Sequence, residues 1–195
     1  MGMSASGLAA QALRAIPRKR VSRALGWLSS ARAPQPLVDA AIAGFVRVYD
    51  VDLSEVDMPA EGFRTFDDFF TRGLRAGARI VDPDPSALVS PADGRLEDLG
   101  EITLDGTLSV KGRPYTVTDL LGDPTSAARY EGGHYFIVYL STRDYHRVHA
   151  PTCGDVQCVR YVPGTLFPVN RIGTELLSQV FARNERLAIV QEGAA

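Results

Sequence analysis

The chain has 195 residues, of which 45% are hydrophobic and 23% charged, and its formal net charge is −2 at pH 7. This length is sufficient for one sizeable domain, and no run of about 18 apolar residues is present to form a membrane-spanning helix. The two cysteines, Cys153 and Cys158, are too few for a disulfide framework and have no second Cys/His pair to complete a zinc site.

Charge is distributed unevenly along the chain. The first 38 residues contain six basic residues and no acidic one, whereas the remainder holds 15 basic and 23 acidic residues. A cationic N-terminus on an acidic body indicates an anionic partner surface, and a membrane leaflet is the natural candidate. We expect an interfacial amphipathic helix over residues 8–32, broken or kinked at Pro17, with Trp27 on its apolar side. A mitochondrial transit peptide and an ordinary solvated helix are the alternatives.

Helical signals continue to about residue 70. After a Pro-rich break, apolar residues recur at helical spacing over 37–48, which predicts a second helix. Thr65, three residues before Asp68, is typical of the capped start of a short helix. Its phenylalanines are expected in the core: Phe66, Phe69 and Phe70. We interpret residues 1–62 as a basic, amphipathic, helical membrane-associating region.

From Leu88 onward the sequence changes to short β-type runs separated by glycine and proline. These runs are LVS, RLEDLG, ITLDGTLSV, YTV, HYFIVYLS, DVQCVRYV and RLAIVQE. Asp-Gly within 104–107 indicates a hairpin turn, 117–122 a short helix, and 172–184 another helix or an irregular arm. The sequence therefore predicts an α+β fold, with the helical region packed on a β-rich, mainly antiparallel catalytic core over 63–195 that is incomplete at its C-terminal end.

Two motifs place ionisable side chains at turns. Asp93 lies in a Pro-Ala-Asp-Gly turn directly after an apolar run, and His146 and His149 lie three residues apart in DYHRVH, after a β-rich run. A tight turn at the end of a strand lets both imidazoles point into one pocket. A hydrogen bond from the ring N–H of one of them to Asp93 would fix the tautomer of that histidine for proton transfer. The alternatives are an ordinary Asp-Gly turn and two surface histidines.

A rigid, apolar stretch, YVPGTLFPVN at 161–170, either lines an apolar ligand site or is a surface crossover. The two lysines, Lys19 and Lys111, lie in contexts that do not favour a Schiff-base enzyme with pyridoxal phosphate. The sequence also contains no Walker-type loop and no G-x-G-x-x-G, and its histidines and cysteines do not form a convincing metal site.

Taken in order, five stretches resemble the phosphatidylserine decarboxylase family, particularly its bacterial membrane-associated type. They are FFTRGLRAGARIVD, LVSPADGRL, YFIVYLSTRDYHRVHAP, YVPGTLFPVN and FARNERLAIV. The resemblance covers about residues 60–190, and the Ser-Pro-Ala-Asp-Gly and Asp-Tyr-His-Arg-Val-His motifs in this order are highly specific. It implies a pyruvoyl enzyme that converts phosphatidylserine to phosphatidylethanolamine and carbon dioxide in phospholipid biosynthesis.

The resemblance also implies roles for individual residues. Asp93 and His149 would belong to the Asp-His-Ser triad by which the proenzyme cleaves itself, with His149 activating the serine and Asp93 orienting His149. His146 would lie beside the pyruvoyl group, positioning the substrate or handling protons. The residues expected at the substrate are His146, Tyr145, Gly164 and Phe167.

The family's Leu-Gly-Ser-Thr motif, whose serine becomes the pyruvoyl group, does not occur in this sequence. The resemblance therefore implies a complementary α chain that carries the pyruvoyl group, and we expect no decarboxylation by this chain alone. One alternative is an inactive, truncated relative that acts as a membrane-binding or scaffold module. Another is a decarboxylase of a related amino-lipid or of an amino acid.

The expected partners are phosphatidylserine, an anionic membrane surface, the complementary α chain and a second copy in a homodimer, with no nucleic acid. The expected location is the cytoplasmic side of a bacterial cell membrane, attached peripherally; a mitochondrial inner membrane is less favoured.

Overall fold

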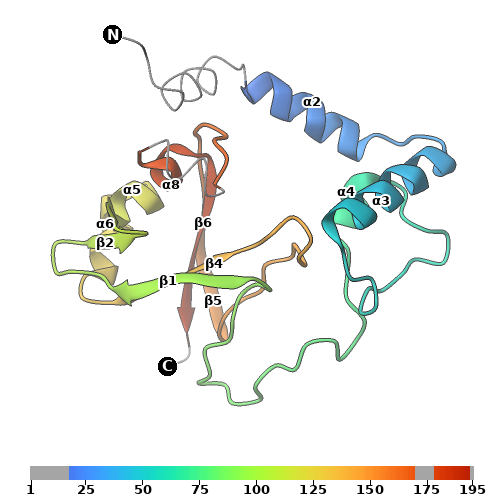
Figure 1. Ribbon diagram of the computed structural model, residues 1–195. Coiled ribbons are helices and arrows are strands. Elements are labelled where there is room, and N and C mark those ends of the chain that lie inside the picture. The colour runs from blue at the N-terminus through green and yellow to red at the C-terminus, as the bar shows by residue number, and fades with distance from the viewer. Residues whose placement is uncertain (1–17, 170–177, 194–195) are drawn as a thin grey trace, which may run out of the picture. The chain divides into compact units, whose positions relative to one another are not determined.

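A computed structural model describes residues 18–169 and 178–193 of the chain. It contains helices and three two-stranded sheets, which confirms the predicted α+β class (Figure 1). The N-terminal part of the predicted interfacial helix, residues 8–17, lies outside the described residues, as does the first part, residues 172–177, of the predicted helix or arm at 172–184.

The described residues form two compact units. The first, called the hairpin unit here, comprises residues 18–25, 100–135, 156–169 and 178–190. The second, called the motif unit, comprises residues 26–99, 136–155 and 191–193, and it contains both the Pro-Ala-Asp-Gly and the Asp-Tyr-His-Arg-Val-His motifs. Whether residues 1–62 act as a membrane-associating region stays a prediction.

Three helices precede the strands. Helix α2 spans Arg18–Ser30, α3 spans Gln35–Tyr49, and α4 spans Phe66–Phe70. Helix α3 starts after Pro34 and ends at Asp50, which adopts a left-handed conformation with φ of 54°. Helix α4 starts as predicted, because the Thr65 hydroxyl accepts a hydrogen bond from the Asp68 amide at 3.0 Å.

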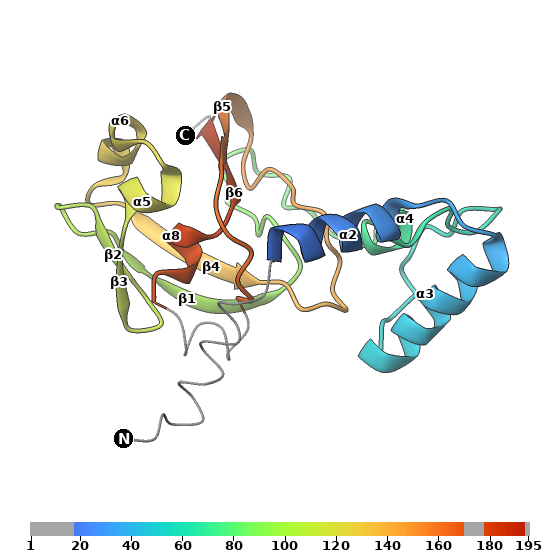
Figure 2. The same ribbon diagram turned by 90° about the horizontal axis from the view of Figure 1, so that it is seen from above.

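The core of the motif unit is aromatic. Phe69 is fully buried and packs with Val51, Val56 and Phe63. Phe45 of α3 meets the phenylalanines of α4 edge to face, with ring centroids 5.1 to 6.2 Å apart, and the two helices lie side by side (Figures 1 and 2). The predicted core role of the α4 phenylalanines is therefore confirmed for Phe69, whereas Phe66 and Phe70 are partly exposed.

The hairpin unit contains the antiparallel pair β2 (Thr107–Val110) and β3 (Arg113–Thr116). Helices α5 (Val117–Leu121) and α6 (Pro124–Ala127) and a 3-10 turn (Ala128–Tyr130) follow directly. The predicted helix at 117–122 is confirmed, and Gly122 ends it with φ of 66°. The later helix α8 spans Val180–Arg183, within the predicted 172–184 segment.

Four further strands pair as β1 (Arg95–Glu101) with β4 (His134–Tyr139), and β5 (Gly154–Val162) with β6 (Arg186–Gly193). Each of these strands runs from one unit into the other, and each coincides with a predicted β-type run.

Two local predictions differ from the structure. Residues 88–90 do not form a strand. Leu88 is exposed, and the only backbone hydrogen bond described for this stretch runs from the Val89 amide to the Pro151 carbonyl, which is too little for a strand pair. The Asp-Gly turn at 104–107 precedes β2 without joining paired strands. The hairpin turns instead at Lys111 and Gly112, whose positive φ values of 51° and 74° match the right-handed twist of paired strands.

Candidate functional site

The Pro-Ala-Asp-Gly turn leads directly into β1 in the motif unit. Its shape depends on Gly94, because a Cβ atom there would lie 2.6 Å from the Tyr139 carbonyl oxygen and 2.8 Å from a Val138 methyl group. The close approach holds the turn against the end of β4. The Asp93 side chain is therefore presented where the histidine motif begins.

The Asp93 carboxylate is paired with an arginine. Arg79 donates from Nε at 2.7 Å and from Nη2 at 2.5 Å to the same oxygen, Asp93 Oδ2, and from Nη1 at 2.8 Å to Glu55 Oε2. The hydrogen bonds to Asp93, and then those to Glu55, raise the pKa of Arg79. No hydrogen bond to Asp93 Oδ1 is found among the described residues, so this oxygen is free to accept one.

The histidine motif starts in a tight turn after β4. The Ser141 amide donates to Asp144 Oδ2 at 2.6 Å, and the Asp144 amide donates back to the Ser141 carbonyl at 2.9 Å. This reciprocal pair fixes the direction in which the following residues leave the strand. Among the described residues, Arg143 and Asp144 form no ion pair with each other.

His146 is held by a backbone contact and by a ring. Its Nδ1 lies 2.8 Å from the Asp144 carbonyl oxygen, and its ring contacts the Phe70 ring at a tilt of 37°, with centroids 4.1 Å apart. Because a carbonyl oxygen only accepts, this hydrogen bond requires a proton on Nδ1. In the neutral imidazole, Nε2 is then the atom that can take up a proton.

His149 lies beside the Asp93 turn through its backbone. The His149 amide donates to the Pro91 carbonyl at 2.7 Å, two residues before Asp93. The His149 Nε2 atom is 2.9 Å from the Tyr145 hydroxyl, and the two rings are stacked with centroids 5.6 Å apart. The two motifs, about fifty residues apart in sequence, are therefore adjacent in the motif unit.

The buried Arg72 side chain contacts the backbone at the start of the histidine motif. It is only 3% exposed, and its Nη2 atom donates to the carbonyl oxygens of Arg143 at 2.9 Å and Asp144 at 3.2 Å. Burial lowers the pKa of this guanidinium, partly offset by the charge of Asp144. Its Nε and Nη1 atoms are buried without hydrogen-bond partners, while the Phe69 ring lies 5.3 Å away.

A polar cavity of about 900 Å³ lies in front of these groups. Asp93, Arg79 and Tyr145 line it, together with acidic and basic side chains from the loop after α3 and from the turn after β4. Neither His146 nor His149 is among the residues that line the cavity. His146 directly follows Tyr145 in the sequence, and His149 lies four residues after it. A cavity of this volume is in the size range of binding sites for small molecules.

The structure thus brings the predicted residues Asp93, His149, Tyr145 and His146 into one unit. It does not record the predicted Asp93–histidine hydrogen bond, since Asp93 pairs with Arg79 and His149 with Tyr145. Sequence reasoning missed Arg79, Glu55 and Arg72. The available signal was the spacing of arginines in RGLRAGAR, which was attributed only to the family resemblance.

The other two predicted substrate residues, Gly164 and Phe167, belong to the hairpin unit. A Cβ atom at Gly164 would lie 2.4 Å from the Arg183 carbonyl oxygen, so glycine is required for packing there. Phe167 is buried against Val180, and the Asn184 side chain bonds its backbone amide at 2.8 Å and its carbonyl at 2.7 Å. Their role at the substrate stays a prediction.

The described part of the chain offers neither a membrane-spanning helix nor a metal cluster. None of the helices between residues 18 and 193 that the structure describes is long and apolar enough to cross a membrane. In the same part of the chain, no three His, Cys, Asp or Glu side chains are grouped to hold a metal ion.

Comparison with known proteins gives consistent matches. A family model described as "Phosphatidylserine decarboxylase" matches residues 66–194. A protein of Anaeromyxobacter sp. (strain K), named phosphatidylserine decarboxylase proenzyme, is 43% identical over 181 residues, which cover 93% of this chain and 64% of that protein. Proteins of the same name from Brevibacillus brevis and Acinetobacter baumannii are 40% and 42% identical over 173 residues.

Each match includes most of this chain but a smaller share of the relative. The match spans 88% of this chain for both the Brevibacillus and the Acinetobacter proteins, but 60% and 61% of their own lengths. The chain thus spans about 60% of the length of the curated relatives it matches.

Proposed function

The chain belongs to the phosphatidylserine decarboxylase family, and we propose that it is the β-chain part of a proenzyme that converts phosphatidylserine to phosphatidylethanolamine and carbon dioxide. The observation that carries this proposal is the adjacency of the two motifs, joined by the 2.7 Å hydrogen bond from the His149 amide to the Pro91 carbonyl. It places the segment of the two histidines beside the turn of Asp93, whose carboxylate lines one polar cavity together with Tyr145.

Decarboxylation of an α-amino acid requires an electron sink, and the residues that line the cavity are carboxylates, guanidiniums, hydroxyls and apolar groups. A pyruvoyl group, carried by a complementary α chain, supplies that sink through its carbonyl when it is in place. The residues present fit such a group, because His146 offers a free Nε2 and Tyr145 a hydroxyl. We assign these two side chains to its surroundings.

For maturation, Asp93 and His149 are assigned to orient and activate the cleavage serine. The Tyr145 hydroxyl now lies 2.9 Å from His149 Nε2, which is the position that a serine hydroxyl would take up in a triad. With Nε2 accepting from a hydroxyl, the proton of the neutral imidazole is on Nδ1. That proton is suited to the second oxygen of Asp93, which Arg79 leaves free.

Arg79 and Glu55 serve as positioning residues in this proposal. Because Arg79 donates twice to Oδ2, the carboxylate is restrained in rotation beside a permanent cation. Glu55 in turn holds Arg79. Such outer contacts determine the orientation of a triad carboxylate without touching the reacting atoms.

His146 is assigned to proton handling during turnover. Its Nδ1 is committed to the Asp144 carbonyl and its ring to Phe70, so only Nε2 is available for exchange with the substrate. An imidazole can both accept and return a proton, which suits this role.

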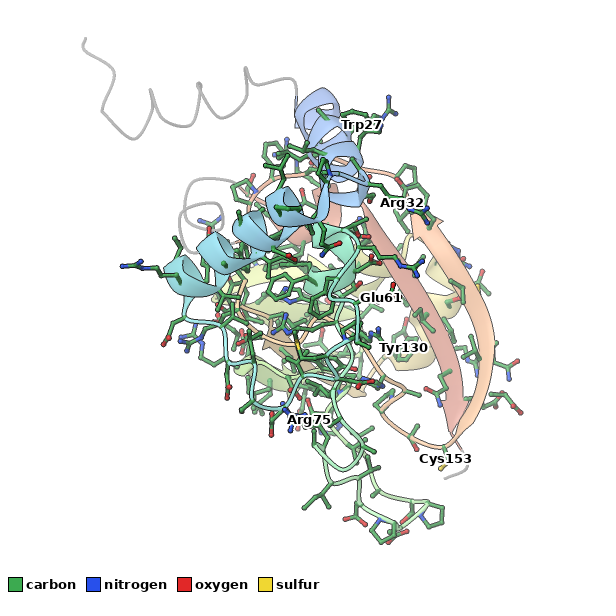
Figure 3. The ribbon with its side chains drawn as sticks, turned by 90° about the vertical axis from the view of Figure 1, so that its right-hand side faces the viewer. Trp27, Arg32, Glu61, Arg75, Tyr130 and Cys153 are labelled. Carbon is green, nitrogen blue, oxygen red and sulfur yellow. The ribbon has the colours of Figure 1, made fainter. Side chains whose placement is uncertain are left out.

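The lipid substrate would be reached from an anionic leaflet by peripheral attachment. The support is the exposure of large apolar side chains on α2 and α3, among them Trp27, which is 74% exposed and projects away from α2 (Figure 3). Arg32 follows α2 in the same basic stretch. Aromatic and basic side chains together are typical of interfacial binding, here on the cytoplasmic side of a bacterial membrane. A homodimer at this surface is part of the same proposal.

The test is release of labelled carbon dioxide from carboxyl-labelled phosphatidylserine in vesicles. The chain is co-expressed with the C-terminal part of the Anaeromyxobacter relative, beginning where the match ends, and the control pairs that part with its own N-terminal part. We expect both pairs to release carbon dioxide. Release by the control pair alone would contradict the proposal.

A further inference from the structure

The outer face of the β5–β6 sheet in the hairpin unit is apolar and exposed. Over residues 187–190 of β6 the side chains alternate, with Ala188 and Val190 buried and Leu187 and Ile189 exposed by 58% and 53%. Such alternation is the mark of a strand with one buried face. The exposed face of β6, however, carries leucine and isoleucine in place of polar residues.

The contacts of β5 and β6 with helix α5 show that their exposed apolar residues share one side of the sheet. Arg160 of β5 donates to the Leu121 carbonyl, and Arg186 of β6 donates to the Leu120 carbonyl at 2.5 Å, so both point to α5. Val159 and Tyr161, which alternate with Arg160, therefore lie on the opposite side, as does Leu187. Val159 and Tyr161 are 58% and 60% exposed.

We name Val159, Tyr161, Leu187 and Ile189 the outer face. Its polar atom, the Tyr161 hydroxyl, already donates to Glu185 Oε2 at 2.9 Å. None of the four is charged, and β5 and β6 pair only with each other among the described strands. A face of this kind, beside strand edges without a neighbour, is what a further strand or sheet covers in a complete β structure.

We propose that the outer face is the docking surface for the complementary α chain, through an apolar, strand-forming segment of it. This inference rests on the proposed function, in which the chain is one part of a proenzyme. Two observations favour this occupant. About 40% of the length of the Brevibacillus brevis relative lies outside the match to this chain, which is long enough to supply such a strand-forming segment. The four side chains of the outer face also include no basic one, and the charge of Arg23 near Tyr161 is opposed by Glu185, so the face lacks the cluster of basic side chains that an anionic membrane surface would require.

The experiment measures binding without catalysis. The full chain is titrated with the purified C-terminal part of the Anaeromyxobacter relative in the absence of phospholipid. We expect saturable binding. Leu187→Lys and Ile189→Lys should each raise the Kd at least about tenfold, because either substitution would bury a lysine in an apolar contact. Val159→Lys on the neighbouring strand provides an independent third variant.

A matched control is Leu104→Lys, which alters an 83% exposed leucine in a turn of the same unit. We expect its Kd to remain within about twofold of the unchanged chain. Circular dichroism of each variant shows whether the chain is still folded, which is expected because all substituted side chains are exposed.

Unchanged Kd values in the three outer-face variants would overturn the inference, as would a chain that binds no partner while the matching Anaeromyxobacter N-terminal part does. Self-association of the chain that Leu187→Lys abolishes would assign the face to a second copy and would also overturn it. A complex that forms through this face but releases no carbon dioxide contradicts the proposed function and leaves the docking surface standing.

Discussion

Arg79 donates two hydrogen bonds to Asp93 Oδ2, from Nε at 2.7 Å and from Nη2 at 2.5 Å, and leaves Asp93 Oδ1 free. The carboxylate is thus oriented by a neighbour that takes no part in proton transfer. Because the His149 amide is bonded to Pro91, the free oxygen and the imidazole belong to adjacent segments. In the triad that we propose, Arg79 therefore orients the carboxylate independently of the serine.

The first prediction concerns Arg79. In a fusion of this chain to the C-terminal part of the Anaeromyxobacter relative, we expect Arg79→Ala to slow self-cleavage about tenfold or more, because Asp93 loses both restraining hydrogen bonds. Arg79→Lys, which keeps the charge and one donor, should recover part of the rate. The measurement is the time course of chain cleavage on a denaturing gel.

The control for this series is Arg64→Ala. Arg64 makes only an exposed, 3.9 Å contact with Glu61, so its loss is expected to leave cleavage unchanged. Equal rates for Arg79→Ala and Arg64→Ala would mean that Asp93 needs no positioning partner.

The second prediction compares two glycines. Gly94→Ala should destabilise the chain and slow cleavage, because the new methyl group would lie 2.6 Å from the Tyr139 carbonyl oxygen. Gly44→Ala, in the middle of α3 with nothing within 4 Å, should instead stabilise it by up to about 1 kcal/mol. Urea unfolding measures both free energies, and a stabilising Gly94→Ala would show that the turn is not packed against β4.

The third prediction concerns membrane attachment. Trp27→Ala should reduce sedimentation of the chain with vesicles of anionic phospholipid several-fold, since it removes a large, exposed interfacial side chain. Raising the salt concentration should weaken binding further, because the basic N-terminal segment contributes electrostatically. Leu104→Ala, in a turn of the hairpin unit, is the matched exposed control, and an equal effect of both changes would argue against α2 as the attachment site.

The fourth prediction is a pH dependence. The Ser126 hydroxyl, with smaller contributions from backbone amides and Arg160, lowers the pKa of Asp123 below its usual value of 3.8. Its stabilising effect is therefore complete above the unfolded pKa and is lost as the pH falls through the folded pKa. Asp123→Asn, which keeps a helix-capping oxygen without the charge, should flatten the stability curve below about pH 4. The readout is urea unfolding between pH 5 and pH 2.5, and an unchanged curve would contradict it.

Local signals in the sequence predicted much of the fold. The Thr65 cap of α4 and the Gly122 end of α5 depend on contacts within a few residues, so the sequence states them directly. Residues 88–90 were wrongly predicted as a strand because an apolar triplet looks the same whether or not a partner strand is present. The hairpin at Lys111 was missed because lysine rarely adopts positive φ, whereas Asp105-Gly106 carried the stronger turn signal.

The sequence predicted which residues belong to the candidate site, but not which residues they hydrogen-bond with. Asp93 and the two histidines are visible as motifs, whereas their partners come from elsewhere in the chain. Arg79 lies 14 residues before Asp93 and Glu55 lies 24 residues before Arg79, in stretches with no periodic pattern to relate them. Such pairings depend on the path of loops, which no residue spacing encodes.

The most direct test of the account compares His149→Ala and His146→Ala in the fused proenzyme. His149 is assigned to maturation and His146 to turnover, so we expect His149→Ala to remain uncleaved by mass spectrometry. His146→Ala should cleave normally and yet release carbon dioxide at least about a hundredfold more slowly. Normal cleavage of His149→Ala would contradict the account.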